Sequence, residues 1–114
     1  MISQDSDPPI ACRLNALSSG ERIRQKELLE KVRDRALQVV EIALGFEVRF
    51  PSDRLTFVEL AEWVGLERLC CPFAEFAILW RRDETVWVRV TGGEGAKEVL
   101  AAEMGFKLGG QLAK

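Results

Sequence analysis

The sequence predicts a small α+β protein in which helices pack mainly on one face of a three-stranded sheet, in the order α-β-α-β-β-α. Three observations predict this class: stretches with apolar residues at helical spacing, shorter stretches that alternate apolar and polar residues, and glycines or prolines between them. A chain of 114 residues is long enough for one domain that buries about two-thirds of its unfolded surface.

The chain is expected to form one structured domain with short polar ends. Residues 1–9 are polar and finish with two prolines, so we expect a disordered arm there. Residues 10–106 form the predicted domain, which begins with a short extended segment that carries Cys12. Residues 107–114 contain two glycines and are expected to form a frayed tail.

The first helix is predicted to begin at Ser18, because Glu21 follows three residues later and the two residues form a capping box. Apolar residues then recur at helical spacing, opposed by Glu, Lys and Arg, at Ile23, Leu29, Val32, Ala36, Val39, Val40 and Ala43. We expect one long amphipathic helix that ends at Gly45, because glycine favours the left-handed conformation of a helix cap.

A strand and a second helix are predicted next. Residues 46–50 alternate apolar and charged side chains and precede Pro51, a pattern that is typical of a strand. Ser52 or Asp53 is expected to cap the helix, whose apolar stripe consists of Phe57, Leu60, Ala61, Val64 and Leu69. Pro72 ends this helix, because the residue before a proline is disfavoured in helical geometry.

The remainder of the domain is predicted to be a hairpin followed by a third helix. Residues 76–81 and 86–91 have the composition of strands and flank the polar turn 82–85. A glycine-rich stretch then leads into a helix over residues 96–104.

The hairpin is expected to present one aliphatic and one aromatic face. A turn centred on residues 83 and 84 places Trp80 opposite Trp87. The predicted aromatic face carries Phe76, Ile78, Trp80, Trp87 and Arg89, the first four of which form the expected interface. Too few helices are predicted to cover it, which favours a contact surface and a homodimer. The alternatives are cover by the long helix or a chain end, and a bulge that shifts the register.

The composition excludes several classes of function. The chain has no histidine and no tyrosine, which excludes Ser-His-Asp and Cys-His catalysis, so we expect a protein that is not an enzyme. A net charge of −2 provides no basic field for nucleic acid or membranes. The polar start is unlike a secretory leader, and no apolar stretch approaches the ~20 residues that span a bilayer, so we expect a cytoplasmic protein.

The three cysteines of the chain are the candidate site. Cys70 and Cys71 are neighbours at a helix end, where successive side chains point about 100° apart. Alone, they favour plain packing as small apolar residues. Cys12 changes this interpretation, because its extended segment is able to lie beside the end of the second helix. Three converging thiols without histidine favour a soft metal ion, a metalloid or thiol redox chemistry.

Zinc fits this set less well, because a closed tetrahedral site needs a fourth ligand and Glu67 or Glu75 would be a poor one. Glu67 and Arg68 are expected to lie around the thiols rather than to bind the ion. No cofactor is predicted other than this soft ion. The alternative is a self-associating module without enzymatic activity, in which the cysteines only pack.

Four stretches of the chain resemble a family of small uncharacterised bacterial proteins. They are IACRLNALS, GFEVRFP, ERLCCPFAEF and VRVTGGEGAKEVL, which match the family's IAC-x-L start, RF strand, ER-x-CC-x-F helix end and glycine-rich finish. The resemblance covers about positions 10 to 100, and ER-x-CC is its most specific part. It implies that the three cysteines belong to one shared pattern with Glu67 and Arg68. It also implies an association with heavy-metal resistance.

Overall fold

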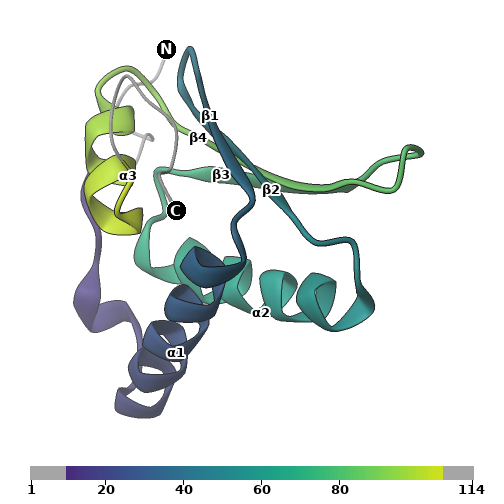
Figure 1. Ribbon diagram of the computed structural model, residues 1–114. Coiled ribbons are helices and arrows are strands. Elements are labelled where there is room, and N and C mark those ends of the chain that lie inside the picture. The colour runs from purple at the N-terminus through teal and green to yellow at the C-terminus, as the bar shows by residue number, and fades with distance from the viewer. Residues whose placement is uncertain (1–9, 107–114) are drawn as a thin grey trace.

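The computed structural model describes residues 10–106, which form three α-helices and one four-stranded sheet (Figure 1). A 3-10 turn (Leu14–Ala16) is followed in order by α1 (Ser19–Arg35), β1 (Gln38–Ile42), β2 (Gly45–Phe50), α2 (Arg54–Cys70), β3 (Glu75–Trp80), β4 (Val86–Thr91) and α3 (Ala96–Met104). The predicted α+β class is confirmed. The disordered arm predicted for residues 1–9 and the frayed tail predicted for residues 107–114 lie outside the described residues.

The sheet is wholly antiparallel and has the strand order β1-β2-β4-β3. The prediction of three strands in the order α-β-α-β-β-α is therefore wrong, because β1 pairs with β2 ahead of α2. The observed order is α-β-β-α-β-β-α. β1 and β3 form the two edges of the sheet, and α2 carries the chain from one side of β4 to the other.

The predicted long first helix is wrong at its C-terminal end. α1 ends at Arg35, and Ala36 adopts an extended backbone with φ −62° and ψ 122°. In β1, Val39 is buried and Val40 is half-buried, so apolar residues that fit a helical spacing also fit the alternation of a strand. Their β-branched side chains favour the strand.

Gly45 is not the left-handed helix cap that the sequence predicts. It opens β2, where it pairs with Ile42 on one side and with Thr91 on the other. A Cβ atom at this position would lie 1.9 Å from the carbonyl oxygen of Val90. Glycine is required here because two strand backbones approach closely.

The predicted N-terminal caps of α1 and α2 are confirmed. The Ser18 hydroxyl accepts a hydrogen bond from the Glu21 N–H, and the Glu21 carboxylate accepts one from the Ser18 N–H. The Asp53 carboxylate accepts a hydrogen bond from the Thr56 N–H and caps α2. The last residue of α2 is Cys70. These short-range patterns therefore fix where the helices begin and place the cysteine pair at a helix end.

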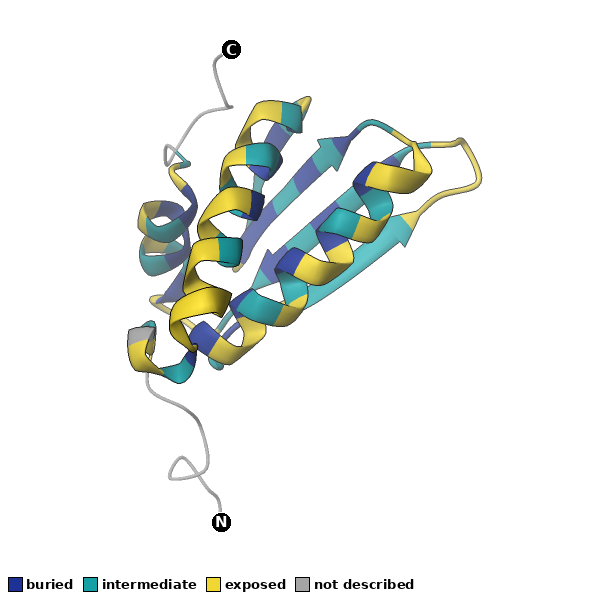
Figure 2. Cartoon of the chain, turned by 90° about the horizontal axis from the view of Figure 1, so that it is seen from below, coloured by how far each residue is buried: buried dark blue, intermediate teal, exposed yellow. Residues whose placement is uncertain are grey.

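α1 and α2 lie side by side across one face of the sheet and turn their buried residues toward it (Figure 2). Near α3, Phe46 of β2 packs edge-on against Phe106 with 5.1 Å between ring centroids. No helix within residues 10–106 is long and apolar enough to cross a membrane. The core between sheet and helices includes Leu28, Val32, Val39, Val48, Phe50, Leu60, Trp63, Val86, Val88, Val90, Leu100 and Met104.

The hairpin of β3 and β4 has a different register from the predicted one. Trp80 pairs with Val86, and Leu79 pairs with Trp87. Five residues, 81–85, connect the two strands, and Glu84 among them has a left-handed backbone with φ 66°. A loop of odd length shifts the pairing by one residue relative to a two- or four-residue turn.

This shift places Trp80 and Trp87 on opposite faces of the sheet, because side chains alternate along a strand. Trp80 lies on the face that the helices cover, where its ring is 5.3 Å from that of Phe57. Phe76 shares this face and packs against Trp63 at 6.0 Å. The predicted single face of Phe76, Ile78, Trp80 and Trp87 is therefore wrong as a grouping, and the homodimer stays a prediction.

Candidate functional site

Three thiols from distant parts of the chain converge at the end of α2. The Sγ atoms of Cys12 and Cys71 lie 3.0 Å apart. The sulfur atoms of Cys12, Cys70 and Cys71 and a carboxylate oxygen of Glu103 all lie within 4.8 Å of one another. All three cysteines are free thiols. The convergence that the sequence predicts is present, and we call these four residues the thiol cluster.

The segment before the 3-10 turn holds Cys12 at this place. The Arg13 N–H donates a hydrogen bond of 2.6 Å to the Cys70 carbonyl oxygen, one of the carbonyls that a helix C-terminus leaves without a partner inside the helix. Leu17, on the other side of the turn, is buried in the core. Cys12 itself is half-buried and forms the accessible side of the thiol cluster together with half-buried Glu103.

Cys70 and Cys71 are both fully buried, although neighbouring helical side chains point about 100° apart. The expected divergence fails because Cys71 has left helical geometry, with φ −120° and ψ 73°. The proline that follows disfavours a helical backbone at Cys71. Pro72 therefore ends the helix, as predicted, and its effect on the preceding backbone lets both sulfurs enter one cluster.

Glu103 of α3 is a member of the thiol cluster that sequence reasoning missed. Its Oε1 atom lies 3.5 Å from the Cys12 sulfur. In the sequence it lies between Leu100 and Met104, which are buried. The sequence therefore shows only an acidic residue at the edge of an apolar helix face, which does not by itself indicate a site. The predicted alternative ligand, Glu75, is exposed on β3.

Glu67 lies beside the thiols and is fully buried. Its Oε2 atom accepts a hydrogen bond of 3.0 Å from the Gln25 amide of α1, and its Oε1 atom is 3.9 Å from the Cys71 sulfur. Burial, followed by the nearby charge of Glu103, raises the pKa of Glu67 to about 7. Glu67 therefore lies next to the thiols, as the sequence predicts, at 3.9 Å from the Cys71 sulfur.

Burial also holds the thiols in their protonated form. It raises the pKa of Cys12 to about 11 and raises the pKa of Cys71 well above its ordinary value. Reactive cysteines have a lowered pKa, because the thiolate is the nucleophile. These two thiols are therefore poor nucleophiles at neutral pH and must lose protons when they bind a metal cation.

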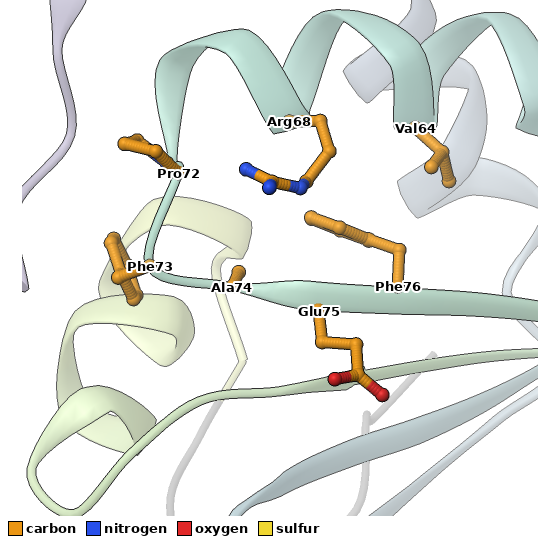
Figure 3. A pocket seen from close by; sticks show the side chains of 7 residues that line it. All are labelled: Val64, Arg68, Pro72, Phe73, Ala74, Glu75 and Phe76. Carbon is orange, nitrogen blue, oxygen red and sulfur yellow. The ribbon is translucent and has the colours of Figure 1, made fainter. Parts of the chain in front are cut away.

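Arg68 belongs to a different site from the thiols. It is exposed and lines a groove of about 350 Å³ with Val64, Pro72, Phe73, Ala74, Glu75 and Phe76. Its guanidinium reaches between Pro72 and Phe76, whereas Glu75 points away from it (Figure 3). No hydrogen bond or ion pair within residues 10–106 joins Arg68 to the thiol cluster.

Comparisons of the chain with protein-family models, with curated proteins and with solved structures found no match. The resemblance carried by the IAC-x-L and ER-x-CC-x-F motifs therefore stays a prediction.

Proposed function

We propose that Cys12, Cys70 and Cys71 bind one soft metal ion or metalloid, and that ion binding is the function of this protein. The observation that carries the proposal is the convergence of three sulfurs and one carboxylate oxygen within 4.8 Å. A metal–sulfur bond is about 2.3 Å long, so one ion at the centre is within reach of all three sulfurs after small side-chain shifts. Soft thiolate ligands select thiophilic ions over hard cations such as magnesium.

The location of the cluster supports a binding role over simple packing. Cys12 is half-buried, so an ion has access from the side where Cys12 and Glu103 meet. Cys70 and Cys71 are fully buried and would hold the ion away from water.

A second candidate function, redox sensing, uses the same sulfurs. The 3.0 Å between Cys12 and Cys71 favours a disulfide between these two residues upon oxidation. Such a bond would remove two of the three ligands. Metal binding and disulfide formation therefore exclude each other, and the cluster would bind its ion only when reduced.

Titration of the fully reduced protein with mercuric, arsenite and zinc ions, followed by native mass spectrometry, tests the proposal. We expect one ion per chain for the preferred ligand. The Cys12→Ser variant should lower its affinity by at least roughly 100-fold, the upper range for loss of a supporting partner. Asn15→Ala, at an exposed position of the same segment, is the matched control. Equal stoichiometry and affinity in wild type and Cys12→Ser would refute the proposal.

A further inference from the structure

The thiol cluster offers three sulfurs and one oxygen within residues 10–106. A tetrahedral zinc ion takes four ligands, usually sulfur or nitrogen. A linear two-coordinate ion separates its two sulfurs by about 4.6 Å, twice a typical metal–sulfur bond, and leaves the third sulfur without a bond. Cys12 and Cys71 lie only 3.0 Å apart, so this pair is too close for a linear ion. The number and spacing of the sulfurs therefore fit a bound atom that bonds to all three sulfurs and carries them on one side of itself.

The charge of the cluster also limits its ligand. A divalent ion on three thiolates leaves one net negative charge, and the Glu103 carboxylate adds a second. Cys70 and Cys71 are fully buried, and none of the ion pairs within residues 10–106 includes Glu67 or Glu103. The nearby Arg33 guanidinium donates to the backbone carbonyl oxygens of Met104 and Glu103 and forms no ion pair with a carboxylate of the site. A divalent complex would therefore leave charge in a buried site without an ion pair to offset it.

We propose that the ligand is an uncharged hydroxide of a trivalent metalloid, of the arsenous or antimonous acid type, bound by Cys12, Cys70 and Cys71. This inference rests on the proposed function and narrows it. A trivalent metalloid forms three bonds in a pyramid and keeps a lone pair in the fourth direction. Three thiolates complete its ligand set, and their charges balance the metalloid, so the adduct is neutral.

The binding step is a condensation without a change of oxidation state. For each cysteine, one metalloid–sulfur bond forms and one metalloid–oxygen bond breaks. The thiol proton combines with the departing hydroxide and leaves as water. One trihydroxide and three thiols thus give one three-sulfur adduct and three water molecules, and no net charge enters the buried site.

Glu103 distinguishes the two classes of ligand. For a divalent ion it is the only carboxylate in the thiol cluster that can act as the fourth ligand. For a metalloid it is a neighbour of Cys12, 3.5 Å from its sulfur, and makes no bond to the bound atom. Removing its charge should therefore weaken a divalent complex and leave the metalloid adduct unaffected.

The experiment compares the reduced wild-type chain with Glu103→Gln, using sodium arsenite and zinc chloride as probes in separate titrations. Native mass spectrometry gives the stoichiometry and the number of hydrogens lost. We expect one arsenic per chain with loss of three hydrogens, and an arsenite affinity in Glu103→Gln within roughly threefold of wild type. Any zinc affinity should be lower than that for arsenite and should fall at least roughly tenfold in the variant.

Three results would overturn this inference. Zinc that binds more tightly than arsenite would assign the site to a divalent ion and leave the proposed function intact. An arsenic adduct that retains a hydroxide, or an arsenite affinity that falls with Glu103→Gln as zinc does, would exclude the three-sulfur adduct. If neither probe nor mercuric ion binds the reduced chain, the proposed function fails as well. Circular dichroism of the variant confirms that it is folded in each comparison.

Discussion

The sulfur of Cys12 lies 3.0 Å from the sulfur of Cys71, although 59 positions separate the two residues in the sequence. The contact is held by a backbone hydrogen bond from Arg13 to the end of α2. It joins the N-terminal segment to the helix at the point where the helix ends. Without this contact, Cys12 would not lie beside the two cysteines at the end of α2.

Oxidation of the reduced, ion-free protein should join Cys12 to Cys71 and leave Cys70 free. It should be slow at neutral pH, because burial raises the pKa of both reacting thiols. Hydrogen peroxide would accept the two electrons and two protons and leave as two water molecules. The new bond closes a loop of 59 positions, which stabilises the fold by up to about 4 kcal/mol in the chain-entropy account. Peptide mapping under non-reducing conditions and urea unfolding measure the connectivity and the gain in stability.

A pair of variants provides the control for this oxidation. Cys70→Ala should still form the bond, whereas Cys71→Ala should not. A predominant bond between Cys70 and Cys71, which are direct neighbours, would contradict the geometry of the cluster.

The stability of the ion-free protein should fall as the pH rises from about 4.5 to about 7. Burial raises the pKa of Glu67 to about 7 from its ordinary 4.5, so the folded state holds this proton more tightly than the unfolded state does. The stabilisation that protonated Glu67 contributes is fully present below pH 4.5 and is lost as the pH rises above its folded pKa of about 7. Over this range the loss amounts to about 3 kcal/mol.

Urea unfolding of wild type and Glu67→Gln across this pH range measures the effect. The variant should show little dependence on pH in this window, because its amide does not titrate. Glu30→Gln, at an exposed position of α1, should follow the wild-type curve. Three other carboxyl groups have lowered pKa values because they accept hydrogen bonds: Asp53 from the Thr56 backbone, Glu59 from Lys31 and Glu62 from Arg24. Their effect on stability therefore falls below this pH range. Parallel curves for wild type and Glu67→Gln would show that Glu67 titrates normally.

Gly45→Ala should destabilise the protein by about 3 kcal/mol or more, as expected for a severe steric clash. The added methyl group would lie 1.9 Å from the Val90 carbonyl oxygen and would force β2 and β4 apart. Gly65→Ala is the matched control, because nothing lies within 4 Å of its Cβ position on the exposed side of α2. That change should stabilise the helix by up to about 1 kcal/mol. Equal stabilities of the two variants would contradict the pairing of β2 with β4.

Those parts of the fold that depend on neighbouring residues were predictable from the sequence. Ser18 and Asp53 cap their helices through hydrogen bonds that reach only three residues along the chain. The fourth strand was not predictable, because the spacing of Val39 and Val40 fits both a helix and a strand and the preference of β-branched residues for strands is weak. Only pairing with β2 decides between the two structures, and that pairing is a tertiary contact.

The candidate site shows the same division. The three cysteines were identifiable because three thiols without histidine have a distinct chemistry. The joint burial of Cys70 and Cys71 was not predictable from the sequence, because it depends on a backbone that leaves helical geometry at Cys71. Glu103 was not identifiable either, since a single acidic residue on a short helix is ordinary in sequence and gains meaning only beside Cys12.

Cys12, Cys70 and Cys71 are proposed to hold one ion together. Anomalous diffraction from crystals loaded with the tightest-binding ion of the titration tests it most directly. We expect a single strong peak per chain, within bonding distance of all three sulfurs. A peak bonded to fewer than three of them, or one located away from the end of α2, would contradict it.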